Sequence, residues 1–154
     1  MRFLLFGIIG LVILGIIGVA FTIWRARTVP PPSNVGGGDL QPCPDTSNCV
    51  STLQTDDEQH RMEPISYTGT LPEARQQLIS VINELPRSEV ITQTDDYIHV
   101  VFRSATMGFP DDVEFTFDED TQQINFRSAA RMGRDDLGVN RDRMQTIRDR
   151  FGTS

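Results

Sequence analysis

The sequence predicts an α+β fold: an N-terminal transmembrane helix, then a small domain with a mainly antiparallel sheet of two hairpins, packed by two helices. Three observations support this fold class. Residues 3–24 contain no charged side chain. Residues 71–85 repeat apolar side chains at the spacing of an amphipathic helix. Residues 89–104 and 113–128 each hold two β-rich runs separated by a turn, which is the pattern of a hairpin.

The uncharged run is long enough to cross a membrane. At ~1.5 Å rise per residue, a helix over residues 3–24 spans roughly the ~30 Å core of a bilayer. Trp24, followed by Arg25 and Arg27, is typical of the interface at the end of a membrane helix. We therefore expect a retained single-pass anchor. The alternative is a signal peptide that is cleaved after the small residue Ala20.

Composition divides the chain into three parts. Residues 1–27 form the predicted membrane anchor. Residues 28–38 contain three consecutive prolines and three consecutive glycines, so they are typical of a linker that is partly stiff and partly flexible. Residues 39–154 form the predicted α+β domain, which is long enough for one modest hydrophobic core.

The charge of the chain limits its partners. Its 14 basic residues, all arginines, face 21 acidic residues, for a net charge of −7. Arg2, Arg25 and Arg27 lie in the anchor, so residues 28–154 carry 11 arginines and all 21 acidic residues, a net −10. Nucleic acid would repel such a domain. The expected partners are the membrane, through the N-terminal helix, and an unknown protein or small anionic ligand.

Two cysteines enclose a short polar loop. Turn-forming residues separate Cys43 from Cys49, and a disulfide between them would fix the entrance to the domain. Such a bond persists only outside the reducing cytosol, and two free thiols are the alternative. A metal site is incomplete, since neither a second cysteine pair nor a histidine lies nearby in the sequence.

The orientation of the domain rests on two conflicting signals. Arg25 and Arg27, on the domain side of the helix, slightly favour a cytoplasmic domain under the positive-inside rule. The cysteine loop favours export. We give more weight to the cysteines and expect a single-pass membrane protein with an extracytoplasmic domain.

The domain is expected to contain a helix, four strands and a second helix. Thr70 and Glu73 form a capping box at the start of the first helix, and Pro86 ends it. Asn140 is expected to cap the final helix. The elements are predicted at residues 71–85, 89–94, 97–104, 113–117, 123–128 and 141–151.

Two strand ends carry the same four residues. Phe102 to Ala105 and Phe126 to Ala129 both read Phe-Arg-Ser-Ala. Because side chains alternate across a sheet, Arg103 and Arg127 are expected on one face. Forked arginine donors suit a carboxylate or a phosphate. The predicted anion-binding face consists of Arg103, Ser104, Arg127, Ser128, Arg131, Arg134 and Asn140.

Little in the sequence points to catalysis. The histidines are His60 and His99, and His99 lies in an alternating strand where it is expected to pack or to face solvent. The sequence holds no zinc signature, phosphate-binding glycine loop or dinucleotide motif. No catalytic residue, metal ligand or cofactor is predicted.

Motifs of a known family are spread along residues 39–151. The most specific is the run from Arg127 to Arg143, and the others lie at residues 43–51, 60–67, 102–104 and 109–115. Together they resemble the uncharacterised family called domain of unknown function 1499. Ala130 and Asp135 depart from it, since hydroxyl residues are expected there. The resemblance implies a small α+β domain, often membrane-attached or exported, and brings no established reaction, cofactor or ligand.

We therefore predict a membrane-tethered binding or assembly module that docks an acidic group on its arginine face. The alternative is a metal-assisted, hydrolase-like enzyme using Asp111, Asp112 or Asp136, although no Ca²⁺-loop spacing is present. A third interpretation is an envelope-structural protein whose domain binds nothing specific. For the arginine face the alternative is cross-strand ion pairing, because Asp112 and Glu114 share parity on the intervening strand.

Overall fold

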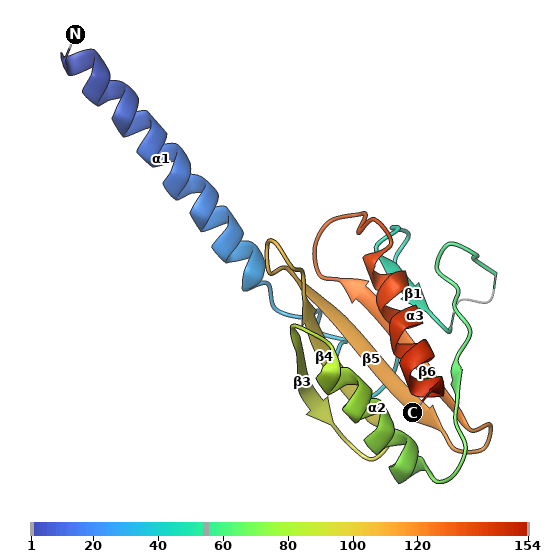
Figure 1. Ribbon diagram of the computed structural model, residues 1–154. Coiled ribbons are helices and arrows are strands. Elements are labelled where there is room, and N and C mark those ends of the chain that lie inside the picture. Colours follow the sequence, from blue (N-terminus) through green and yellow to red (C-terminus); the bar gives the residue numbers. More distant parts are fainter. Residues whose placement is uncertain (1, 54–55, 154) are drawn as a thin grey trace.

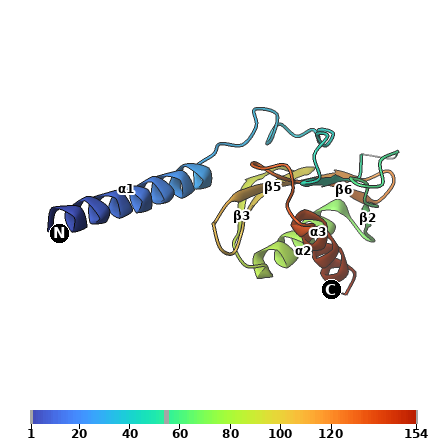
Figure 2. The same ribbon diagram turned by 90° about the horizontal axis from the view of Figure 1, so that it is seen from above.

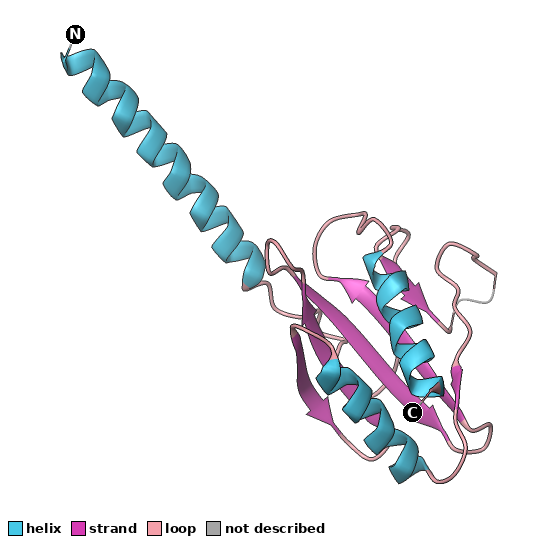
Figure 3. Cartoon of the chain, in the orientation of Figure 1, coloured by secondary structure: helices cyan, strands magenta, loops and turns pink. Residues whose placement is uncertain are grey.

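The computed structural model describes residues 2–53 and 56–153 and confirms the α+β fold. One antiparallel sheet carries two helices on one face, and a long N-terminal helix projects away from the domain (Figure 1). Figure 3 separates helices, strands and loops by colour. In chain order the elements are α1 (Arg2–Arg27), β1 (Cys49–Ser51), β2 (Ile65–Ser66), α2 (Leu71–Glu84), β3 (Ser88–Gln93), β4 (Tyr97–Arg103), β5 (Pro110–Asp118), β6 (Gln123–Ala130) and α3 (Val139–Gly152).

The sheet is a meander of four long strands with two short strands beside the last of them. Its order is β1-β6-β5-β4-β3, and β2 also pairs with β6. Every pair is antiparallel, and β3–β4 and β5–β6 are the two predicted hairpins. The sequence did not predict β1 and β2, because strands of three and two residues are too short to show alternation.

The helices cover one face of the sheet and form the hydrophobic core with it. Figure 2 shows α2 and α3 on the same side of the sheet. Phe115 and Phe126 lie opposite each other on β5 and β6 and are fully buried on this side. From the helices, the core receives Ala74, Leu78, Val81, Ile82, Met144, Ile147 and Phe151. On the opposite face, the buried side chains include polar or charged ones, among them His99, Asp112 and Glu114.

The predicted start of α2 is confirmed, but the predicted start of α3 is wrong. The capping box of Thr70 and Glu73 is present. The N-cap of α3 is Gly138, not Asn140, and Gly138 takes a left-handed φ of 81° that favours glycine. Asp136 supplies the capping carboxylate, because its Oδ1 accepts from Gly138 N at 3.0 Å and its Oδ2 from Asn140 N at 2.8 Å.

Residues 28–38, which we call the strap, run over the face of the sheet opposite the helices (Figure 2). Arg131 donates from Nη1 to the Val29 carbonyl at 2.7 Å. The backbone N–H of Gly36 donates to Tyr97 Oη at 3.0 Å. The strap is therefore held against the domain at two points along its length.

Helix α1 is long and apolar enough to cross a membrane. Its segment Phe6–Arg27 has a mean hydropathy of 2.7 in its most apolar window, none of which is buried; a signal sequence has the same properties. Its last turn contacts the domain, since Arg27 Nε donates to the Met107 carbonyl at 2.6 Å and Arg103 Nη1 donates to the Arg27 carbonyl at 3.3 Å. The loop between β4 and β5 thus lies beside the end of α1 (Figure 1).

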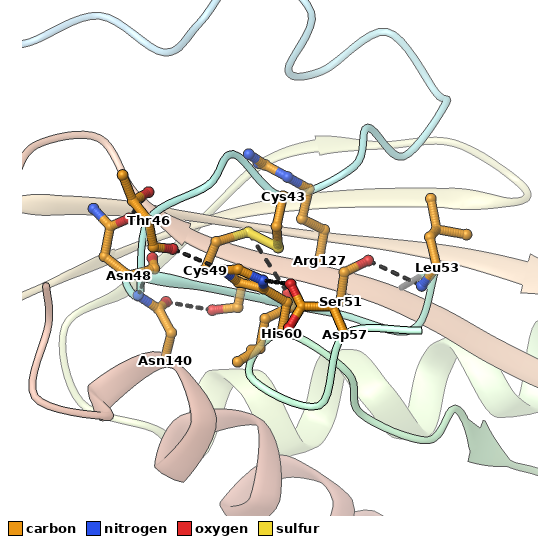
Figure 4. Close-up of a disulfide and its surroundings, with 12 residues drawn as sticks. Cys43, Thr46, Asn48, Cys49, Ser51, Leu53, Asp57, His60, Arg127 and Asn140 are labelled. Atoms are coloured by element: carbon orange, nitrogen blue, oxygen red, sulfur yellow. Dashed lines mark hydrogen bonds and ion pairs between the residues drawn. A yellow bond between two sulfur atoms is a disulfide. The ribbon is translucent and has the colours of Figure 1, made fainter. Parts of the chain in front are cut away.

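Cys43 and Cys49 form the predicted disulfide. Figure 4 shows the bond beside β1, with the ring of His60 beneath the same loop. His60 is buried, and its Nδ1 pairs with Asp57 while its Nε2 donates to the Thr46 carbonyl at 2.8 Å. His60 therefore joins the disulfide loop to the segment that follows β1.

This arrangement predicts a pH-dependent contribution of His60 to stability. Burial alone lowers the pKa of His60, but the hydrogen bonds to Asp57 and to the Thr46 carbonyl outweigh it and raise the pKa above its ordinary value. The stabilisation is complete below the unfolded pKa of about 6.5 and is lost as the pH rises through the raised folded pKa.

We expect Asp57→Asn to lower the Tm at pH 5.5 and to change it less at pH 9, because the stabilisation falls as the pH rises through the raised folded pKa. Thermal unfolding followed by circular dichroism at the two pH values checks this. Asp120→Asn, in an exposed turn, is the control for loss of a surface carboxylate. An equal loss of Tm at both pH values contradicts the prediction.

Candidate functional site

The strand register places Arg103 and Arg127 on the same face of the sheet, but at separate positions. Arg103 lies opposite Pro110 at the end of β4, whereas Arg127 lies opposite Glu114 in the middle of β5. Pro110 and Glu114 are four residues apart, so their side chains point the same way. The two arginines therefore share a face without converging on one ligand.

Asp112 is the centre of a first buried polar cluster on this face. Its carboxylate accepts from His99 Nε2 at 2.8 Å and from both Nε and Nη2 of Arg131, at 2.8 and 2.7 Å. Only 2% of Asp112 is exposed. Burial raises the pKa of this carboxyl, but the hydrogen bonds from His99 and Arg131 outweigh it and hold the pKa below its usual range. Arg131 is thus bound to a carboxylate of its own domain.

Glu114 is the centre of a second cluster beside the first. Tyr97 Oη donates to Glu114 Oε1 at 2.6 Å, and Arg127 Nη1 lies 3.6 Å from Glu114 Oε2. Burial and the neighbouring Glu114 both raise the pKa of the Tyr97 hydroxyl, while burial lowers the pKa of Arg127. Arg127 therefore makes a cross-strand ion pair of the kind that the sequence offered as an alternative, while Arg131 pairs with Asp112 from the loop after β6.

Ser128 and Asn140 lie on the helix side of the sheet, in a third cluster. Ser128 Oγ donates to Asn140 Oδ1, and Arg143 Nη1 donates to both side chains. Arg143 Nη2 also donates to Asp111 Oδ2 at 2.6 Å. Burial raises the pKa of Asp111, although Arg143 opposes the shift. These contacts join α3 to β5 and β6.

A pocket of about 370 Å³ lies where the end of α2, the end of β4 and the start of α3 meet. Its wall is mostly apolar, and the guanidinium of Arg143 stacks over the ring of Phe102 at 4.8 Å. Of the predicted residues, Arg103 and Ser104 line this pocket. The other lining residues are Leu85, Pro86, Arg87, Phe102, Ala105, Val139, Arg143 and Thr146.

The rim of the pocket carries arginines that the domain does not neutralise. Arg87 Nε donates to the Arg103 carbonyl at 3.1 Å, and Arg103 Nη1 donates to the Arg27 carbonyl. Within residues 2–53 and 56–153, no carboxylate lies within 4.0 Å of the guanidinium of Arg87 or Arg103. Both side chains are exposed, so both charges are available to an anion.

Arg134 lies on the loop between β6 and α3, away from the pocket lining. Its carbonyl accepts from Ser47 Oγ at 3.0 Å, and the neighbouring Gly133 carbonyl accepts from Asn48 Nδ2 at 3.0 Å. The backbone of this loop therefore supports the disulfide loop, while the Arg134 side chain stays exposed.

The acidic residues offered as metal ligands are separated by the fold. Asp111 and Asp112 are adjacent on β5, so they point to opposite faces of the sheet and each pairs with a different arginine. Asp136 caps α3. In the part of the chain that the structure describes, no three His, Cys, Asp or Glu side chains are grouped as metal ligands.

Sequence reasoning missed two of the three arginines that line the pocket, Arg87 and Arg143. Arg143 follows Asn140 by three residues on a predicted helix, a spacing that places both on one side. Arg87 gave no such signal, because it follows the helix-ending Pro86 and takes a left-handed φ of 61° in the turn before β3.

The fold and the pocket define a class of protein: a small α+β domain that follows an apolar N-terminal helix. Helices cover one face of its sheet, and a pocket rimmed by arginines lies beside the end of α1. A family model described as a protein of unknown function, DUF1499, matches residues 39–151. The chain belongs to this family. A search of curated proteins gave no match.

Proposed function

We propose that the protein is a membrane-tethered binding module whose pocket beside the end of α1 takes an anionic group. The observation that carries this proposal is the pair of exposed arginines, Arg87 and Arg103, without a carboxylate partner at the rim. Forked guanidinium donors bind carboxylate and phosphate oxygens in pairs. The tether itself is supported by the length and hydropathy of α1, and an extracytoplasmic domain by the disulfide.

The pocket differs from the face that the sequence predicted. Arg103 and Ser104 remain in the proposed site, while Arg127 and Arg131 are engaged by Glu114 and Asp112. A volume of about 370 Å³ falls within the range of small-molecule sites. Its apolar wall favours a ligand that carries an apolar part next to its negative charge.

The rival function, a metal-assisted hydrolase, has less support. It needs carboxylates that converge on one ion. Asp111 is bound by Arg143 and Asp112 by Arg131, on opposite faces of the sheet. Because the two carboxylates point to opposite faces and each is paired with its own arginine, they do not converge on one ion, and the binding module is the better-supported proposal.

Phenyl phosphate tests the proposed function, because it joins a dianion to an apolar ring and stays in water. We expect the full chain in phosphatidylcholine nanodiscs to bind phenyl phosphate more tightly than inorganic phosphate or neutral phenyl glucoside. Arg103→Gln should weaken the affinity about tenfold, since it removes a charge-assisted contact. Isothermal calorimetry or NMR titration measures both effects.

Arg134→Gln is the matched control, because it removes an equally exposed arginine outside the pocket. Its affinity for phenyl phosphate should equal that of the unmodified protein. Binding of phenyl phosphate that is insensitive to Arg103→Gln, or no better than that of phenyl glucoside, would disprove an anion site at the rim.

A further inference from the structure

The pocket opens next to the end of the helix that would cross the bilayer. Ala26, in the last turn of α1, is only 5% exposed, so this turn packs against the domain. The Arg27 side chain donates to the Met107 carbonyl, and the Arg27 carbonyl accepts from Arg103, a lining residue of the pocket. The rim of the pocket is thus joined directly to the last residue of α1.

The position of α1 fixes where lipid headgroups would lie. Trp24 and the following arginines are typical of the level where a membrane helix leaves the hydrocarbon core. The headgroup layer extends several ångströms beyond that level on each side. Arg103, in contact with Arg27, therefore lies at the depth of the headgroups of the same bilayer.

The charge at this end of the domain is opposite to the charge of the whole. Residues 28–154 carry 11 arginines and 21 acidic residues. In the described part of the chain, four arginines at the pocket rim and in the last turn of α1 have no carboxylate within 4.0 Å, whereas Arg143 in the pocket lining pairs with Asp111. The four are Arg25, Arg27, Arg87 and Arg103. A negatively charged protein thus presents a basic end toward the membrane, which complements an anionic lipid surface.

The pocket wall suits the rest of a lipid molecule. Next to the arginines it offers Leu85, Phe102 and Val139, and Val139 is partly exposed. A phospholipid joins an anionic phosphate to apolar chains. The phosphate matches the arginines at the rim, and the chains match the apolar wall. A free inorganic phosphate would leave this apolar surface uncovered.

We propose that the pocket binds an anionic phospholipid of the bilayer that α1 crosses, with Arg87 and Arg103 on its headgroup and the apolar wall against the start of an acyl chain. This inference rests on the proposed function and names its ligand class. It assigns the basic end of the domain a lipid-docking role, and it accounts for the position of the pocket beside α1.

Spin-labelled lipids in nanodiscs test the proposal on the full chain. The discs contain phosphatidylcholine with about 10% phosphatidylglycerol, and the label is carried on one lipid or the other. We expect the motionally restricted fraction of label to be about threefold higher for phosphatidylglycerol than for phosphatidylcholine. In the double variant Arg87→Gln, Arg103→Gln, the two fractions should become equal.

Two further variants distinguish a lipid preference of the pocket from one of the basic end of α1. Val139→Asp places a negative charge in the pocket wall at an exposed position in the first turn of α3, where a carboxylate suits the helix. It should also abolish the preference for phosphatidylglycerol, with an unchanged circular dichroism spectrum. If Arg25→Gln with Arg27→Gln abolishes the preference while Arg87→Gln with Arg103→Gln leaves it intact, the preference belongs to the helix end and the proposal is wrong.

The outcomes also separate this inference from the proposed function. If phenyl phosphate binds at Arg103 but the lipid labels show no preference, the pocket takes an anion from another source, such as a soluble metabolite or an acidic peptide. The lipid assignment is then overturned and the binding module stands. If neither probe binds at Arg103, both proposals fall.

Discussion

Replacing Asp112 by alanine should lower the free energy of unfolding by about 3–5 kcal/mol, because it leaves a buried cation without its partner. Arg131 donates two hydrogen bonds to Asp112, and its side chain is 9% exposed. His99 donates a third hydrogen bond to the same carboxylate. Once Asp112 is removed, the buried Arg131 keeps its desolvation cost and loses the compensating charge.

Chemical denaturation of the full chain in a mild detergent measures this loss. Asp120→Ala, an equal truncation in an exposed turn, should change the midpoint little. The double variant Asp112→Ala, Arg131→Met should recover part of the lost stability, because no unpaired charge remains. A loss for Asp112→Ala as small as that for Asp120→Ala would show that the carboxylate is solvated in the folded protein.

Replacing both cysteines by serine should lower the free energy of unfolding by roughly 2 kcal/mol, the loop-closure value for so short a loop. The bond joins residues six apart in sequence. It fixes the segment that leads into β1, where Cys49 pairs with Ala129 of β6. We therefore expect the variant to lose stability mainly around β1, which should detach from β6 before the hydrophobic core unfolds.

Dithiothreitol provides the internal control for the disulfide. It should shift the denaturation midpoint of the unmodified protein to that of the Cys43→Ser, Cys49→Ser variant and leave the variant unchanged. Thiol trapping in intact cells then reports the compartment: bonded cysteines agree with an extracytoplasmic domain, and fully alkylated thiols overturn it.

The elements with strong periodicity were predictable from sequence. Helix α2 combines a capping box, a helical apolar repeat and a terminal proline, and the two hairpins combine alternation with turns. The short strands β1 and β2 were not predictable, because they form by pairing with β6 and show no alternating pattern of their own. The start of α3 was misplaced because the capping carboxylate, Asp136, lies two residues before the N-cap Gly138.

The candidate site was only partly predictable. Strand parity placed Arg103 and Arg127 on one face, but parity does not say which carboxylate reaches which arginine. Arg131 lies in the loop after β6 and binds Asp112 on β5, a contact that cannot be predicted from the local sequence. The pocket brings together segments near residues 86, 103 and 143, so its existence depends on tertiary packing.

The strap gives the protein a defined response to tension. A pull on α1 would first load the contacts that Arg27 makes with Met107 and Arg103. It would next load the contact between Arg131 and Val29, and then the contact between Tyr97 and Gly36. Peeling would then stop at Cys43, where a covalent bond to Cys49 carries the load. The freed residues 28–42 could extend up to about 50 Å, so the domain could be drawn away from its anchoring plane by that distance while β1 stays paired in the sheet.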